Sequence, residues 1–142
     1  WKSGEAAQLS DEIIHLLLEG ASNFPTPMSA IAIFRLQGAY TSVAADATAF
    51  ALREPLWDIN VVAQWLDDAE SERNISWGRQ LWARIEPLTG GGRVYINHFA
   101  GDDRPERIRA SYGKNYDKLA ALKRKYDPEN LFRLNPNIKP TG

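Results

Sequence analysis

The chain has 142 residues, of which 44% are hydrophobic and 25% are charged, and its formal net charge is -1. This length and composition suit one domain with a single hydrophobic core and exclude a disordered segment. The small net charge and the absence of any apolar run near the roughly 18 residues of a membrane span give no sign of a nucleic-acid or membrane partner.

The first elements are predicted to be a helix and a strand. Ser10 is a good N-cap, and apolar residues recur after it at helical spacing, so we expect a helix over residues 10–20. The stretch MSAIAIFRLQG, residues 28–38, is rich in apolar and β-branched residues and predicts a strand. Arg35 and Gln37 share one face of this strand.

Two more strands are predicted before the middle of the chain. Residues 47–54 give a weak strand pattern, and WDINVVAQWLD, residues 57–67, gives the clearest one. The odd-numbered residues of the second stretch form an apolar core face. The opposite face is half polar and suited to lining a cavity. Its members are Asp58, Asn60, Val62, Gln64 and Leu66.

A long helix is predicted next. It starts at Asp67 or Asp68 and ends at Pro87. Its buried stripe is predicted to contain Ile75, Gly78, Leu81, Trp82 and Ile85. Trp57, Trp65 and Trp82 lie on inward-facing stripes, which predicts that all three are core residues.

The C-terminal third is predicted to hold a short strand and two helices. RVYINHF, residues 93–99, follows a glycine run and reads as the strand. Helices are expected over residues 103–113 and 116–126, and the last residues read as an extended tail. We therefore expect an α+β fold, in which helices pack on one face of an antiparallel sheet and a C-terminal helical segment and extended tail follow.

RVYINHF also carries the strongest candidate side chains for chemistry. On a strand, Tyr95 and Asn97 share a face about 7 Å apart and can address one planar ligand, whereas His98 lies on the other face. The alternative is a buried pair that satisfies backbone groups, and the spacing alone favours that structural role by roughly two to one.

Other kinds of site are poorly supported. His15 and His98 are far apart in sequence and cysteine is absent, so no metal site is predicted, and we expect a reducing, cytoplasmic location. Residues 90–92 are glycines that follow a helix and precede a strand, which is the reverse of a phosphate-binding turn.

The stretch YGKNYDKLAALKRKYDPENLFRLNPNIKP, residues 112–140, resembles the C-terminal signature of the berberine bridge enzyme-like family. These proteins are FAD-linked oxidases of the vanillyl-alcohol oxidase superfamily. The Tyr-x-Asn pattern at residues 95–97 lies upstream, where the family has the same pattern. GAYTSVAADATAFALR and INVVAQW are similar to the family's substrate-domain strands, so the resemblance covers nearly all of the chain.

The resemblance implies a division of the chain. Residues 1–92 would be the C-terminal part of a substrate-binding domain, and residues 93–142 would be the family's C-terminal segment. The family's FAD-binding domain and the His and Cys that carry its flavin in many members are missing. We therefore expect a fragment, inactive alone, whose partners are a small-molecule substrate and an N-terminal FAD-binding domain. The alternative is a free-standing α+β ligand-binding or dimerisation domain, which a start codon just before Trp1 would favour.

The resemblance also implies roles for particular residues. In the family, a base takes a proton from a substrate alcohol or amine while hydride passes to FAD. Tyr95 matches a tyrosine that acts in carbohydrate-oxidising relatives, and His98 is the second catalytic candidate. Asn97 and two residues of the tail, Asn135 and Asn137, are the predicted cofactor contacts.

Substrate contacts are predicted on the polar faces of the strands. Plant alkaloid-forming members carry a carboxylate base on the strand that matches INVVAQW. Val62 stands at the equivalent position, so that mechanism is not carried over. The predicted substrate contacts are Asn60, Gln64, Arg35 and Gln37.

Overall fold

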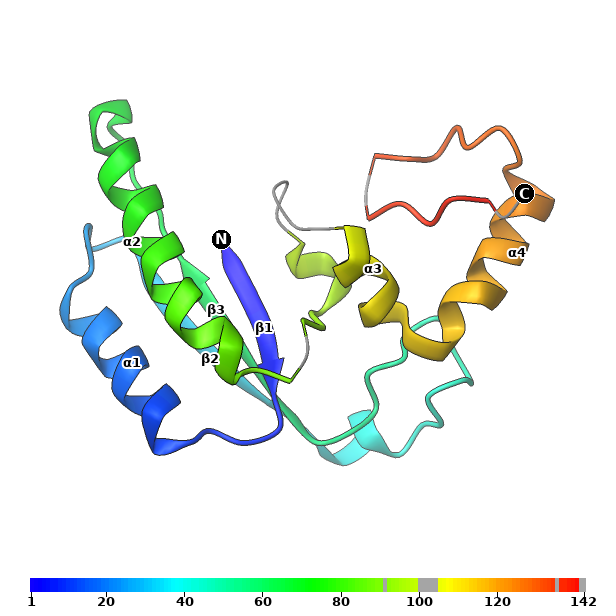
Figure 1. Cartoon of the computed structure of the whole chain (residues 1–142), viewed down its shortest axis with the longest axis horizontal. Helices are drawn as coiled ribbons and strands as arrows, with labels where there is room; N and C mark the ends of the chain where they lie inside the picture. Colours follow the sequence, from blue (N-terminus) through cyan, green and yellow to red (C-terminus); the bar gives the residue numbers. More distant parts are fainter. Residues whose placement is uncertain (91, 100–104, 135, 141–142) are drawn as a thin grey trace.

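A three-stranded sheet forms the centre of the computed structural model, which describes residues 1–90, 92–99, 105–134 and 136–140. Its strands are β1 (Lys2–Ala6), β2 (Ala30–Leu36) and β3 (Leu56–Val62). The order is β1-β3-β2, and β3 is antiparallel to both neighbours (Figure 1). The predicted α+β class with an antiparallel sheet is confirmed.

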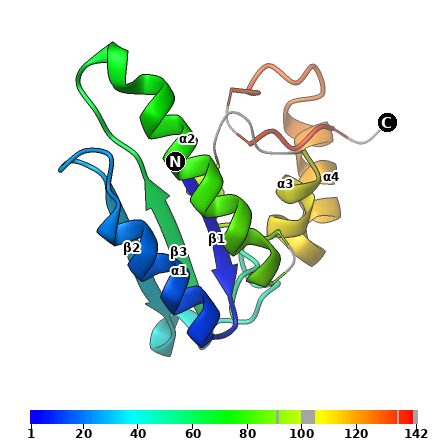
Figure 2. The ribbon, with the colours of Figure 1, turned by 60° about the vertical axis from the view of Figure 1, so that its left-hand side comes forward.

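Helices lie on both sides of this sheet. The α-helices are α1 (Asp11–Ser22), α2 (Ser71–Ile85), α3 (Pro105–Tyr112) and α4 (Tyr116–Tyr126). Single turns of 3-10 helix are η1 (Gly38–Thr41), η2 (Asp68–Glu70), η3 (Glu86–Leu88), η4 (Ile96–His98) and η5 (Gly113–Asn115). In Figure 2, α1 and α2 cover one face of the sheet, whereas α3, α4 and the tail lie on the other side of β1. No helix within the described ranges is long and apolar enough to cross a membrane.

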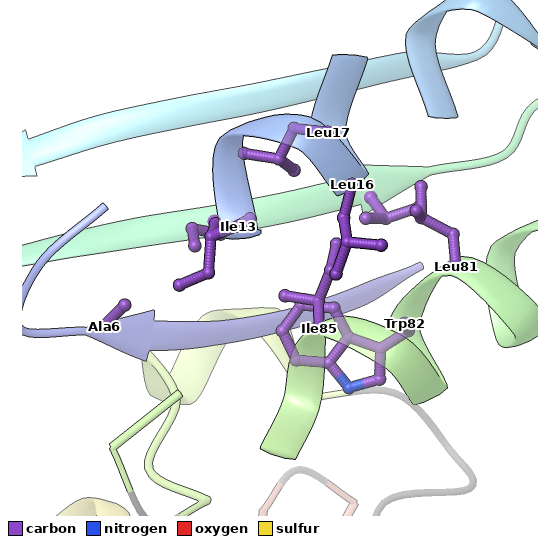
Figure 3. Packing of buried hydrophobic residues seen from close by; sticks show 9 residues of the cluster. Ala6, Ile13, Leu16, Leu17, Leu81, Trp82 and Ile85 are labelled. Atoms are coloured by element: carbon purple, nitrogen blue, oxygen red, sulfur yellow. The ribbon is translucent and has the colours of Figure 1, made fainter. Parts of the chain in front are cut away.

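The hydrophobic core lies between the sheet and the pair α1–α2. Its members are Ala6, Ile13, Leu16, Leu17, Ile59, Val61, Leu81, Trp82 and Ile85 (Figure 3). Gly4 of β1 lies directly under Trp82, since a Cβ added at Gly4 would come within 2.9 Å of the indole ring. A glycine is therefore needed for the indole to pack flat against β1.

Strand β1 is absent from the sequence prediction. Its residues, KSGEA, include no β-branched or aromatic side chain, so no local pattern indicates a strand. The ladder to β3 holds it instead, with Gly4 opposite Ile59 and Glu5 opposite Asp58. Tertiary pairing thus overrides a weak local preference.

The strand predicted at residues 93–99 is wrong. The backbone N–H of Val94 donates to Ser111 Oγ at 3.0 Å, and the N–H of His98 donates to the carbonyl of Tyr95 at 2.7 Å. A side chain of α3 and a local turn satisfy these backbone groups, so they need no neighbouring strand. The result is the 3-10 turn η4, which places Tyr95 and His98 on the same side.

The weak strand predicted at residues 47–54 is also wrong. Asn115 is buried and donates through Nδ2 to the carbonyls of Ala45 and Thr48, at 2.7 and 3.0 Å. The segment before β3 is therefore a loop held by the C-terminal helical region, and it joins no ladder.

Three details of the predicted core are also corrected. Trp57 is only half-buried and lies outside the core cluster, and Arg35 stacks 4.9 Å from the centre of its ring. Ile75 is 40% exposed, because the buried stripe of α2 passes through Asn74, whose Nδ2 donates to the carbonyl of Glu70. β3 ends at Val62, so Trp65 is only half-buried beyond the strand and donates to Ser71 Oγ at 2.9 Å. Gly78, Leu81, Trp82 and Ile85 are buried as predicted.

The start of α1 gives a test of the predicted N-cap. Ser10 Oγ accepts a hydrogen bond from the N–H of Ile13, as the sequence predicts. We expect Ser10→Ala to lower the free energy of unfolding by about 1 kcal/mol, because one N–H of the first turn loses its partner. Urea denaturation measures this, with Ser22→Ala at the other end of α1 as the control. Equal transition midpoints for the two variants would contradict it.

Candidate functional site

The face of the sheet opposite α1 and α2 carries the candidate site. Ser3 and Glu5 of β1 and Asp58 and Asn60 of β3 share this face, and all four are buried. The segment before α3 covers it, because Ser3 Oγ donates to the carbonyl of His98 at 3.4 Å. A buried polar face under a fixed loop is unusual for a core and indicates a site.

Arg107 anchors α3 and the covering segment to this face. Its Nη2 donates to the carbonyl of Ser3 at 2.8 Å, and its Nε donates to the carbonyl of Gly92 at 2.9 Å. The side chain is only 6% exposed, so these charge-assisted bonds are shielded from water. Edge strand β1 is thereby tied to the segment that carries Tyr95 and His98.

A cavity of about 540 Å³ opens beside the buried polar face. It is lined by Phe34, Arg35, Leu36, Tyr40, Phe50, Arg53, Asp58, Tyr95 and His98. Neighbouring rings meet edge to face, with centroids 5.4 Å apart for Tyr40–Phe50, 5.8 Å for Phe50–Tyr95 and 5.0 Å for Tyr95–His98. A wall of aromatic rings with polar groups at its base suits a flat ligand that carries hydroxyl groups.

Tyr95, Asn97 and His98 come together although they do not lie on a strand. Asn97 Nδ2 donates to the Tyr95 hydroxyl oxygen at 2.7 Å, which fixes the position of the phenol. The His98 ring lies between Tyr95 and Trp1, with centroids 5.0 Å from each. Its Nδ1 is 3.4 Å from Asp58 Oδ2, an ion-pair contact that is long for a hydrogen bond. Nδ1 makes no hydrogen bond among the described residues, so Asp58 acts on the imidazole through its charge.

The base of the site contains two buried acids. Glu5 and Asp58 face each other across the β1–β3 ladder and are 2% and 4% exposed. Burial raises the pKa of Glu5 to about 7, and repulsion from Asp58 adds to the rise. Burial also raises the pKa of Asp58, against the opposing effects of Asn60 and His98. Neither oxygen of Glu5 has a hydrogen-bond partner among the described residues.

Polar atoms without partners surround these acids. Within the described ranges, the Tyr40 hydroxyl, Asp58 Oδ1 and Asn60 Nδ2 are buried and make no hydrogen bond. Burial raises the pKa of Tyr40, so its hydroxyl remains a donor at neutral pH. Such atoms cost free energy unless a ligand or water satisfies them, which supports a binding role for this face.

Arg53 supports the aromatic wall of the cavity. Its guanidinium lies 5.8 Å from the centre of the Tyr40 ring and 4.8 Å from that of Phe50. Nη1 donates to the carbonyl of Tyr40 and Nη2 to Thr48 Oγ1, at 3.3 and 3.0 Å. These contacts fix η1 and the loop before β3 relative to each other.

Of the predicted substrate contacts, Arg35 lines the cavity. It stacks 4.9 Å above the Trp57 ring, and its Nε donates to Gln37 Oε1 at 3.3 Å. Asn60 lies at the base of the site and accepts a hydrogen bond at Oδ1 from Trp1 Nε1 at 3.0 Å. Gln64 lies beyond the end of β3, and its side chain is exposed.

The predicted cofactor contacts do not gather in one place. Asn97 bonds to Tyr95, whereas Asn137 lines a separate cavity of about 460 Å³ between α4 and the tail. Asn135 lies outside the described residues.

Sequence reasoning missed several residues of the site. They are Glu5, Phe34, Tyr40, Phe50 and Arg53, whereas Asp58 was placed on the polar face of its strand but was not chosen as a site residue. One signal was available for Asp58, since a charged residue within an apolar strand pattern is expensive to bury without a purpose. No such signal existed for Glu5, because β1 has no strand pattern of its own.

The C-terminal part of the chain matches a known family. Residues 94–139 match the family model described as berberine and berberine-like. This match contains the Tyr95–Asn97 segment, α3, α4 and most of the tail, so it includes the wall of the cavity that carries Tyr95 and His98.

Curated relatives extend the similarity towards the N-terminus. An FAD-linked oxidoreductase of Dictyostelium discoideum is 31% identical over 133 residues, which cover 93% of this chain and 28% of that protein. The aclacinomycin-N/aclacinomycin-A oxidase of Streptomyces galilaeus is 29% identical over 128 residues, which cover 79% of this chain and 24% of the oxidase. The chain therefore spans about a quarter of the length of these relatives.

A solved structure has the same fold. BBE-like 1 of Physcomitrella patens superposes with a TM-score of 0.77 at 26% identity, over 98% of this chain and 30% of that one. The agreement includes the sheet and the C-terminal helices, so their arrangement here is that of a segment within a larger solved protein.

Proposed function

We propose, from the premise that this chain belongs to the berberine bridge enzyme-like family, that it forms the C-terminal region of an FAD-dependent oxidoreductase. The substrate is an alcohol, a sugar or a similar small molecule, and its hydride passes to the flavin. Residues 1–92 form the end of the substrate-binding domain, and residues 93–142 form the segment that completes the site.

The observation that carries this proposal is the wall formed by Tyr95 and His98. These two side chains can transfer protons and line the same cavity, and the buried carboxylate of Asp58 lies beside His98. Relatives named as an FAD-linked oxidoreductase and as an aclacinomycin oxidase support oxidation of a small organic substrate.

The residues of the site fit one side of a flavin site. Rings of Phe34, Tyr40 and Phe50 border the cavity, and unpartnered groups such as Asn60 Nδ2 remain to bind a polar ligand. The chain therefore supplies the substrate side of the flavin ring, and the rest of the cofactor is held elsewhere. FAD, when bound, accepts the hydride that leaves the substrate carbon.

The residues of this chain provide the proton chemistry. Tyr95 acts as its phenolate, which accepts the proton of the substrate hydroxyl and becomes the phenol, and Asn97 Nδ2 holds the phenolic oxygen in place through its 2.7 Å bond. His98, which lies against the Tyr95 ring with Asp58 beside its Nδ1, helps to fix the position of that ring. Arg35 contacts the substrate at the cavity mouth, where Gln37 orients it.

Flavin retention tests the proposal that this chain forms only one side of the flavin site. We expect the complete protein, meaning the product of the full reading frame that contains this chain, to purify with one FAD per molecule. The 142-residue chain alone should retain none after gel filtration and should not turn over substrate. Absorbance spectra of the two preparations measure this. A flavin-loaded preparation of the 142-residue chain would contradict this proposal.

A further inference from the structure

Glu5 and Asp58 form a buried acidic pair that the proton chemistry above does not use. They are direct partners in the antiparallel ladder, so their side chains leave the same face with Cβ atoms about 5 Å apart. Both are more than nine-tenths buried, and Asp58 Oδ1 and both oxygens of Glu5 have no hydrogen-bond partner in the described part of the chain. Two carboxyl groups that are this close together and this well shielded from water are not both ionised at neutral pH, so one of them is protonated.

The surroundings of the pair decide which acid carries this proton. Asp58 has His98 Nδ1 at 3.4 Å, and both His98 and Asn60 favour its charged form. Glu5 has no such contact, and Arg93, whose charge favours ionised Glu5, is already paired with Glu54. Asp58 is therefore the ionised acid of the pair, and Glu5 is the protonated one.

Charged and titratable groups act on Glu5 from four segments on this side of the sheet. They are Asp58 on β3, Tyr40 on η1, Glu54 on the loop before β3 and Arg93 on the covering segment. His98 of the covering segment faces Asp58, and Arg107 of α3 donates to the carbonyls of Ser3 and Gly92. Helices α1 and α2 lie on the opposite face of the sheet (Figure 2). Neither oxygen of Glu5 accepts a hydrogen bond within the described ranges.

We propose that Glu5 is a positioning residue for the acid–base site: its carboxyl group carries the proton of the buried pair, which leaves Asp58 as a single anion that orients His98 beside Tyr95. This inference rests on the proposed function for the roles of Tyr95 and His98, but not for the protonation of Glu5. When Glu5 loses its proton, a second negative charge appears at the base of the site. That charge disfavours the phenolate form of Tyr95, which is the form that accepts the substrate proton.

The first test is the stability of the complete protein as a function of pH. The pKa of Glu5 rises from its ordinary value of 4.5 to about 7 on folding, so the folded state binds more protons than the unfolded state between these values. The stability contributed by this group is full below pH 4.5 and is lost as the pH rises to about 7. This loss is up to roughly 300-fold in the unfolding equilibrium constant. Glu5→Gln should lack this loss, whereas Glu129→Gln, at an exposed position, should keep it.

The second test follows the site itself. We expect the carboxyl ¹³C signal of Glu5 in the wild type to titrate with a midpoint of about 7. This midpoint should move to lower pH in Asp58→Asn, because the repulsion from the second acid is removed. The rate of flavin reduction should lose the same pH step in Glu5→Gln, which a merely structural residue would not cause.

Each outcome decides the proposal. A Glu5 carboxyl that titrates near 4.5 in the wild type overturns it, and this measurement needs no variant to fold. An unchanged Glu5 midpoint in Asp58→Asn also overturns it. If the Glu5 carboxyl titrates near 7 and its midpoint falls in Asp58→Asn, but no compound reduces the flavin, the acidic pair stands and the proposed function fails.

Discussion

Tyr95→Phe should reduce the flavin of the complete protein at least about a hundredfold more slowly than the wild type does. The substitution removes only the phenolic oxygen, which as the phenolate accepts the substrate proton, and loss of a general acid–base group costs roughly 10²–10⁴ in rate. The aromatic wall should remain, because the contacts of the Tyr95 ring with Phe50 and His98 do not need the hydroxyl. Anaerobic stopped-flow absorbance measures the reduction rate.

A matched control separates this effect from a general loss of structure. Tyr126 is 72% exposed at the end of α4 and does not line the cavity of Tyr95, so Tyr126→Phe should leave the rate unchanged. The dissociation constant of substrate for Tyr95→Phe should change only several-fold, since one hydrogen bond contributes about 1 kcal/mol. Wild-type reduction rates in Tyr95→Phe would remove Tyr95 from the reaction.

Trp82→Ala should cause the largest loss of stability, roughly 3–5 kcal/mol, which is typical of a buried aromatic residue cut back to alanine. Trp82 is 4% exposed and lies between α2 and β1 (Figure 3). Its indole covers Gly4, so the cavity left by its removal lies directly on the edge strand that carries Glu5. Relaxation into this space should loosen β1 as well as α2.

Urea denaturation of the wild type, Trp82→Ala and Leu18→Ala measures this difference. Leu18 is 60% exposed on α1, so its truncation removes an apolar side chain that is mostly in water and should cost less than about 0.5 kcal/mol. Hydrogen exchange should be faster at the amides of β1 in Trp82→Ala than in Leu18→Ala. Equal losses of stability in the two variants would show that Trp82 does not hold β1.

Much of the fold could be predicted from periodicity, because its main elements repeat apolar residues at the spacing of their own structure. The alternation of β3 between core and polar faces is visible in WDINVVAQWLD, and the N-cap at Ser10 is visible in its neighbours. Strand β1 could not be predicted. Its pairing partner, β3, starts about fifty residues away, and its own residues carry no strand pattern.

The candidate site was only partly predictable for the same reason. Tyr95, Asn97 and His98 could be selected because they are close in sequence and lie within a recognised pattern. The expected strand would have separated His98 from Tyr95, but the turn η4 brings their rings to 5.0 Å. Glu5 and Asp58 meet only through the ladder of the folded sheet, so no local rule could place them together.

The most direct test of the central claim is the absorbance spectrum of the complete protein before and after anaerobic addition of a panel of alcohols and sugars. The account predicts a flavin spectrum that at least one of these compounds bleaches, at a rate that falls in Tyr95→Phe. A complete protein that purifies without flavin and takes up no added FAD would contradict it.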